Sequence, residues 1–465
     1  MTTRFKTSSR FGLKGVVVIA FGFGLAACNM TAPSIDGTST PVATLSPSEA
    51  VALRLEVSPE AAARLNASGI SASSFGRSVK DAVAAHPELA RAQYSIVAGE
   101  ASRDGAGAYI RPQVSVGAEA IAATSGSGIS TSATPVFRVS QLLYDGGAGH
   151  YGTVAADERV AAARANYAQT ASALAFRAVE AKIAYWNASQ LSRVASERLS
   201  VINHFIEQVE ERLASGVGTE SEITLGRSRL ASARARRIEV QQQLAIARAD
   251  HTEIFGVPPG SGGGLPPVAP VTNSTGSPRL VSLDFTVNSA LFALEQARAQ
   301  RMPGISLGLS ARPPGALSGG VRAELGVNYA LSSGGARAAA IREAEATLNA
   351  IRAEREGVSR QIGRSVATAR SGTRAARERV TAARLSVEAN SDALTSITDQ
   401  FAIGRSDLTS VLDAQRDRSA AQESLIIARS EQVRQSYLAL SITGEILPLF
   451  GVQIPALGAD LAAAE

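Results

Sequence analysis

The residues whose types could do chemistry are few and widely spaced. Cys28 is the one thiol in the chain, so no internal disulfide can form. The glycine-rich run 260–264 lacks the lysine and the strand–helix context of a phosphate-binding loop, and we interpret it as linker. No nucleophile stands beside a base, so we expect neither an enzyme nor a bound cofactor. The histidines are scattered, without metal-ligand spacing: His86, His150, His204 and His251.

Cys28 ends a segment that predicts export and lipid attachment. Residues 1–14 are basic and carry no acid, and the apolar run after them is too short to cross a bilayer comfortably, as in a secretory signal. The Leu-Ala-Ala-Cys motif that ends at Cys28 resembles the bacterial lipobox, in which the cysteine is acylated. We predict a signal peptide over 1–27 and a lipidated tether over 28–75. The alternative is ordinary cleavage beside an incidental thiol.

The positive charge of the chain does not by itself predict a partner. The formal net charge is +5 and the isoelectric point is about 9.5, which would suit a nucleic-acid surface. Nearly all the basic residues are arginines, however, and they interleave with Glu and Ala along helical stretches. Solvated helix faces account for this pattern better, and we expect no nucleic acid as a partner.

The chain contains two copies of one pattern. The segment 143–147 is matched by 331–335, and the segment 214–218 by 402–406, both at an offset of 188 residues. We therefore predict a first repeat over 76–255, a Pro/Gly-rich linker over 256–282, a second repeat over 283–445 and a C-terminal tail over 446–465. A constant offset implies that the element between the two landmarks has a fixed length.

Each copy contains a pair of alternating segments that predict a β-hairpin, over 112–144 and over 303–332. The clearest run places apolar residues at every second position from Val321 to Leu331, with polar residues or Gly between them as far as Asn328. One face then suits lipid and the other suits water, in strands of the length of a tilted transmembrane β-strand. The alternative is a soluble, half-buried hairpin.

A very long helix follows each hairpin. The segments 147–214 and 335–402 contain no Pro, and as helices each would be about 100 Å long. An apolar seam in the first, spaced alternately by four and three residues, is a heptad repeat typical of coiled coils. Its members are Leu174, Ala178, Ala181, Tyr185, Ala188, Ser192, Ala195, Leu199, Ile202, Ile206, Val209 and Leu213.

Each long helix is predicted to end at a glycine turn. Gly216 and Gly404 permit left-handed closure, and Thr219 and Asp407 can then cap antiparallel return helices over 220–253 and 408–443.

Four motifs in this chain, in this order, are similar to those of the TolC family of outer membrane efflux proteins. They are His86–Gln93, Arg111–Ser115, Gln141–Gly147 and Gly404–Gln415. The resemblance covers about residues 76–445. It implies an α+β membrane protein in which three chains close a 12-stranded transmembrane β-barrel, four strands per chain. A long periplasmic barrel of coiled-coil helices would continue it.

The resemblance also implies roles for particular residues. The tip that a periplasmic adaptor binds would comprise Gly216, Val217, Gly218, Gly404, Arg405 and Ser406. Asp413 matches one of two acidic positions of the family's periplasmic constriction, and Ser410 stands at the other. Asp413, Ser410 and Arg405 are therefore the expected gate residues, and a doubled ring of carboxylates is not expected. We consider Arg405 and Arg416 as partners of Asp413 across subunits.

The implied function is a passive export channel in the outer membrane of a Gram-negative bacterium, anchored to outer-membrane lipid. The partners would be a periplasmic adaptor and an inner-membrane transporter of the RND or ABC type. The cargo stays open between small molecules and proteins of a type I secretion system. The alternative function is a non-conducting, lipid-anchored coiled-coil structural protein of the periplasm.

Overall fold

The structure is a computed structural model that describes residues 47–55, 57–125, 128–216, 219–260, 264–270, 276–313 and 320–454. The predicted signal peptide and Cys28 lie outside the described residues, as do Val217, Gly218 and the end of the predicted tail. Lipid attachment at Cys28 therefore stays a prediction.

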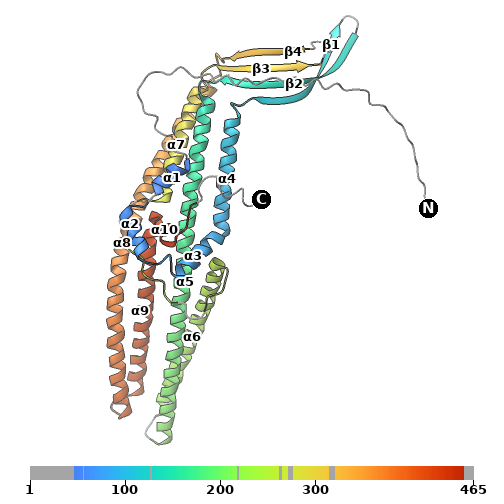
Figure 1. Ribbon diagram of the computed structural model, residues 1–465. Helices are drawn as coiled ribbons and strands as arrows, with labels where there is room; N and C mark the ends of the chain where they lie inside the picture. Colours follow the sequence, from blue (N-terminus) through green and yellow to red (C-terminus); the bar gives the residue numbers. More distant parts are fainter. Residues whose placement is uncertain are drawn as a thin grey trace, which may run out of the picture. The chain divides into compact units, whose positions relative to one another are not determined.

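The first repeat is built in the predicted order (Figure 1). Helices α3 (Ser74–Ala85) and α4 (Pro87–Ala108) precede a hairpin of β1 (Gln113–Ser125) and β2 (Gly128–Tyr144). The long helix α5 (Ala148–Ala214) and the return helix α6 (Glu220–Phe255) follow. The span of α5 agrees with the prediction, and α6 runs two residues further than expected.

The second repeat has the same order. It contains α7 (Pro278–Ala299), β3 (Gly304–Arg312), β4 (Gly320–Asn328), α8 (Ala336–Ala402) and α9 (Leu408–Thr443). Equivalent helices have equal lengths: 22 residues in α4 and α7, 67 in α5 and α8, and 36 in α6 and α9. The offset is 191 residues between α4 and α7 and 188 for the other two pairs. Each residue of these helices therefore has a defined counterpart.

Three short helices lie where the sequence predicts a tether or a tail. They are α1 (Pro47–Leu55), α2 (Pro59–Ala67) and α10 (Ile446–Phe450). Helix α1 packs on α5 and α7, where Val51 is buried and the Arg54 guanidinium lies 4.7 Å from the Phe285 ring centre. The segment 28–75, predicted as a tether, therefore contains two helices, α1 and α2, and α1 is packed on the rest of the chain.

The long helices run side by side (Figure 1). Helix α5 packs along α4 and α6 of its own repeat, and it also packs along α7 and α9 of the second repeat. Helix α8 packs along α7 and α9. Among the described residues, no helix is both long and apolar enough to cross a bilayer.

The predicted heptad seam of α5 is largely buried. Nine of its twelve residues are buried, Ser192 and Leu199 are half-buried, and Leu213 near the end of the helix is exposed. Alanines at many of these positions let the neighbouring helices approach closely, which is why so few large side chains fill the core. The seam thus packs partly on α9 of the second repeat, as at Leu174 and Ala178, and partly on α6 of its own repeat, as at Tyr185 and Ala188.

The largest core lies at mid-length, where α5 and α9 meet α3 and α10. The rings of Tyr437 and Phe450 stack with centres 5.9 Å apart, and Phe75 meets both edge-on. Leu174 is 2% exposed in this cluster. The short helix α10 therefore contributes its apolar side chains to the main core.

Candidate functional site

The four strands form one antiparallel sheet in the order β1-β2-β3-β4. Residues that face each other in neighbouring strands share a face of the sheet, so the register assigns every described strand residue to one of two faces. All the charged residues of the strands share one face. They are Glu119, Arg138, Arg312, Arg322 and Glu324.

The opposite face is mostly apolar among the strand residues whose side chains the structure describes. Its register rows bring Val116 beside Phe137, and Leu307 beside Leu325. These side chains point away from the protein, and Val116 and Leu325 are 78% and 65% exposed. Gln141, opposite Leu307, is a polar exception. An exposed apolar band backed by a charged face suits a sheet with lipid on one side and water on the other.

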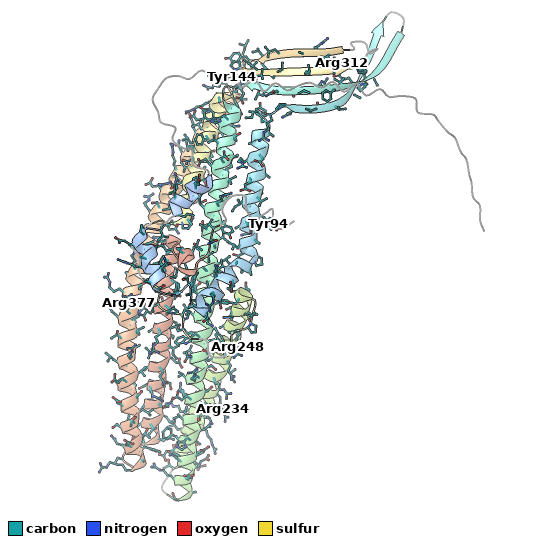
Figure 2. All side chains as sticks on the ribbon, viewed as in Figure 1. Tyr94, Tyr144, Arg234, Arg248, Arg312 and Arg377 are labelled. Carbon is teal, nitrogen blue, oxygen red and sulfur yellow. The ribbon has the colours of Figure 1, made fainter. Side chains whose placement is uncertain are left out.

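A β-bulge explains why β2 alternates less cleanly than β4. The register shifts between Leu142 and Tyr144, so Leu143 is an extra residue in β2. Tyr144 therefore lies on the apolar face, opposite Ile305. It lies at the helix end of the sheet, whereas Arg312 lies towards the far end (Figure 2). The alternation of apolar and polar residues in the sequence did not predict the position of this bulge.

On the polar face, Glu119 accepts hydrogen bonds from two arginines. Arg312 donates through Nη2 at 3.1 Å, and Arg138 donates to the other carboxylate oxygen. The three side chains come from β1, β2 and β3, so this ion-pair group joins three strands. Val136, which lies between them on the same face, is 1% exposed. A charged layer thus covers the polar face at this level.

The turns from α5 to α6 and from α8 to α9 lie at the same end of the helices (Figure 1), and both are glycine turns, as predicted. Gly216 and Gly404 have φ angles of +79° and +73°, a left-handed conformation that other residues adopt at a cost. Thr219 forms a capping box with Glu222 at the start of α6, and Asp407 accepts hydrogen bonds from the amide and hydroxyl of Ser410. These bonds hold the pKa of Asp407 below its ordinary value. Both predicted caps are confirmed.

The predicted gate residues are not brought together as one group. Ser410 is engaged by Asp407 in the cap of α9, and Arg405 is exposed in the turn. Asp413 lies one turn further along α9, and its carboxylate is 3.4 Å from Arg229 of α6 and 3.4 Å from Arg416. Asp413 thus has two partners within its own chain, and it links the two return helices.

Arg212 ties the long helices together near the tip. Its guanidinium donates to the carbonyl oxygen of Phe401 at 2.6 Å and lies 4.1 Å from the centre of the Phe401 ring. The Phe401 ring meets Phe205 edge-on in the apolar cluster at this end. This contact between α5 and α8 was missed from the sequence, because its partners are 189 residues apart.

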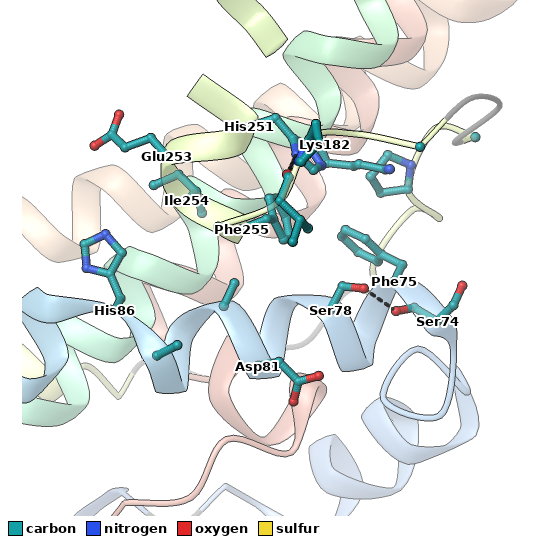
Figure 3. A pocket seen from close by; sticks show the side chains of 18 of the residues that line it. Ser74, Phe75, Ser78, Asp81, His86, Lys182, His251, Glu253, Ile254 and Phe255 are labelled. Carbon is teal, nitrogen blue, oxygen red and sulfur yellow. Dashed lines mark hydrogen bonds between the residues drawn. The ribbon is translucent and has the colours of Figure 1, made fainter. Parts of the chain in front are cut away.

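A cavity of about 730 Å³ lies at mid-length between α3, the end of α6 and the linker (Figure 3). Lys182 and His251 line it. Burial lowers the pKa of Lys182. Burial, and then the Lys182 charge, also hold the pKa of His251 below its ordinary value, although a hydrogen bond with the Val257 carbonyl acts in the opposite direction. The His251 ring stacks on Phe255 with centres 4.3 Å apart.

The described part of the chain thus joins a sheet with one charged and one apolar face to helices far longer than a compact domain requires. The sequence pattern of the outer membrane efflux protein family matches residues 79–257 and 274–442. The chain therefore belongs to the outer membrane efflux protein family. Each matched segment covers most of one predicted repeat, and the second begins nine residues earlier, within the predicted linker.

Individual relatives agree with this assignment. The outer membrane efflux protein BepC of Brucella suis is 25% identical over 332 residues, which cover 68% of this chain and 73% of BepC. The outer membrane protein VceC of Vibrio cholerae has a similar structure, with a TM-score of 0.72 at 18% identity over 80% of this chain and 96% of VceC.

The CmeC outer membrane channel of Campylobacter jejuni also matches, with a TM-score of 0.71 at 12% identity over 80% of this chain and 85% of CmeC. The predicted fold class is thereby confirmed: each subunit combines barrel strands with long channel helices.

Proposed function

We propose that three copies of this chain form a passive, gated channel through the outer membrane. The observation that carries the proposal is the segregation of the sheet, in which the five charged residues share one face and the opposite face is apolar. The charged face would line water in a closed barrel, and the apolar face would contact lipid.

Closure of the barrel requires other subunits. Among the described residues of the chain, β1 pairs only with β2, and β4 pairs only with β3. Two bare strand edges are not viable in lipid, because no water satisfies their backbone groups. Pairing of β4 with β1 of the next subunit, repeated three times, would give 12 strands without an edge.

Asp413 is the proposed charge of the periplasmic gate. It links α6 to α9 through Arg229, close to the tips at which the family resemblance places the constriction. Opening would then require α9 to move relative to α6, which breaks this ion pair. The exposed turns around Gly216 and Gly404 would bind a periplasmic adaptor, and an inner-membrane transporter would supply energy and select the cargo.

Lipid attachment at Cys28 would anchor each subunit in the outer membrane. It rests on the lipobox-like motif alone. Intact-mass measurement of the mature protein tests it, because diacylation adds a defined mass and Cys28→Ala removes the modification.

Planar-bilayer recording of the purified full-length protein tests the channel. We expect uniform conductance steps, and we expect Asp413→Ala to change the current or its block by divalent cations. Asp250→Ala is the matched control, because Asp250 is an exposed carboxylate of the other return helix, α6, near its end away from the tip. Identical traces for Asp413→Ala and the wild type would remove Asp413 from the gate. A complete lack of conductance would favour the non-conducting coiled-coil spacer.

A further inference from the structure

Two large apolar side chains are exposed on the helices α6 and α8 of the single chain. Leu385 of α8 and Ile246 of α6 are 62% and 54% exposed, although helices in water usually place polar residues at such positions. In Figure 1, α8 lies at one edge of the helices and α4 and α6 lie at the other. The two edges are therefore the surfaces available for neighbouring subunits.

The repeat supplies the geometry of that contact. Within the chain, α5 of the first repeat packs on α7 and α9 of the second repeat. Its equivalent α8 packs on α7 and α9 of its own repeat, and among the described residues it has no such extensive contact with helices of the first repeat. If the same contact recurs between subunits, α8 will pack on α4 and α6 of the next copy. The counterpart of a residue in α5 or α6 has a residue number higher by 188 and lies in α8 or α9. The counterpart of a residue in α9 has a number lower by 188 and lies in α6.

The contact within the chain contains ion pairs between the repeats. Four of them join α5 or α6 to α9 among the described residues. They are Glu197–Arg418 at 3.0 Å, Arg236–Glu423 at 2.8 Å, Arg229–Asp413 at 3.4 Å and Glu180–Arg434 at 3.8 Å. We call this contact the within-chain seam.

The counterparts of these pairs are almost all uncharged. In the same order they are Leu385–Leu230, Ser424–Ala235, Asp417–Leu225 and Thr368–Ile246. Asp417 is the one charged residue, and it already lies 3.1 Å from Arg416. The hydrogen bond from Asn288 to Glu158, 3.0 Å long, likewise has Val97 and Ala346 as its counterparts. Positions that carry ion pairs in the within-chain seam are therefore largely apolar at their counterparts in the other repeat.

We propose that the surface between subunits is the apolar counterpart of the within-chain seam, with Leu385 packed against Leu230 of the next copy. This between-chain seam explains why Leu385 and Ile246 are exposed in the single chain. Burial of such side chains favours association, and it does not depend on salt or pH as exposed ion pairs do. The proposal rests on the homotrimer proposed above, and it adds the register and the chemistry of the interface.

Disulfide cross-linking tests the register. Oxidation of Leu230→Cys/Leu385→Cys in the full-length protein should produce covalent dimers and trimers on a denaturing gel without reductant. The matched control is Glu197→Cys/Arg418→Cys, the equivalent positions within the chain, which should cross-link without a change in chain number. Ile238→Cys/Leu385→Cys shifts the α6 position by about 12 Å and should give no ladder.

A charge exchange tests the chemistry. Leu385→Glu should weaken trimer association at least about tenfold, because a buried Leu contact is replaced by an unpaired charge. Adding Leu230→Arg recreates the ion pair of the within-chain seam and should restore most of the trimer. The proposal is overturned if the cysteine pair gives no ladder in protein that is trimeric and conducts, which would leave the channel function intact. Monomeric, non-conducting protein would overturn both proposals.

Discussion

Replacing Leu307 by Arg tests which face of the sheet meets lipid. Leu307 lies on the apolar face, 42% exposed, in β3, which is paired on both sides within the chain. It follows Gly304 by three residues, or about 10 Å along the strand and about 8 Å in depth for a tilt of about 40°. This depth lies between the interface and the midplane of an apolar band about 25 Å tall.

The expected cost follows from that depth. Arg on the lipid face costs about 2–4 kcal/mol at the midplane and about 1 or less near the interface, so we expect about 2 kcal/mol for Leu307→Arg in each subunit. Three subunits make roughly 6 kcal/mol for the assembled barrel. The polar-face control is Ser306→Arg, its neighbour at nearly the same depth. Ser306 is exposed and lies opposite Gly326, where an Arg side chain has room.

Guanidinium titration in lipid vesicles measures this difference. The fluorescence of Trp186, the one tryptophan, reports the folding of α5, and gel mobility reports the trimer. We expect Leu307→Arg to unfold at clearly lower guanidinium than the wild type and Ser306→Arg to stay close to it. If Ser306→Arg proves as costly as Leu307→Arg, or if Leu307→Arg is harmless, the assignment of the faces is wrong.

Three further perturbations test other parts of the structure. Leu174→Ala should cost about 2–5 kcal/mol, read from chemical denaturation, because Leu174 is 2% exposed in the main core. Gly404→Ala should cost about 1–2 kcal/mol and speed amide exchange in the last turn of α8, since φ is +73° there and no atom lies within 4 Å of an added Cβ. His251 has a lowered pKa in the folded chain. As the pH decreases below about 6.5, the unfolded chain therefore binds a proton more readily than the folded chain, and the free energy of unfolding decreases. The melting temperature of His251→Phe should therefore fall less between about pH 7.5 and about pH 5.5 than that of the wild type; equal slopes would contradict this.

The sequence predicted the long helices well because their signals are local. Heptad spacing, glycine at each turn and a capping residue after it all lie within a few residues of the boundary that they set. The bounds of α5, α8 and α9 therefore agree with the prediction. The second copy was located by comparing such local motifs along the chain, because they recur at a constant offset of 188 residues.

The elements missed from the sequence depend on distant surfaces. Helix α10 is only five residues long, and its stability comes from burial against α5 and α9. The partner of Asp413 is equally hidden, because Arg229 is 184 residues away and only the packing of α6 beside α9 brings them together. Local propensity contains no information on such pairs.

The equal lengths of equivalent helices restrict how this chain can change. A four-residue deletion from α8 alone would shorten it by about 6 Å and rotate everything beyond the deletion by roughly 40°. Every second tip around the assembly would then be out of line with its neighbours. Insertions or deletions are therefore tolerated only when both repeats change together, preferably by multiples of seven residues. After the gene duplication, the two copies must keep equal helix lengths.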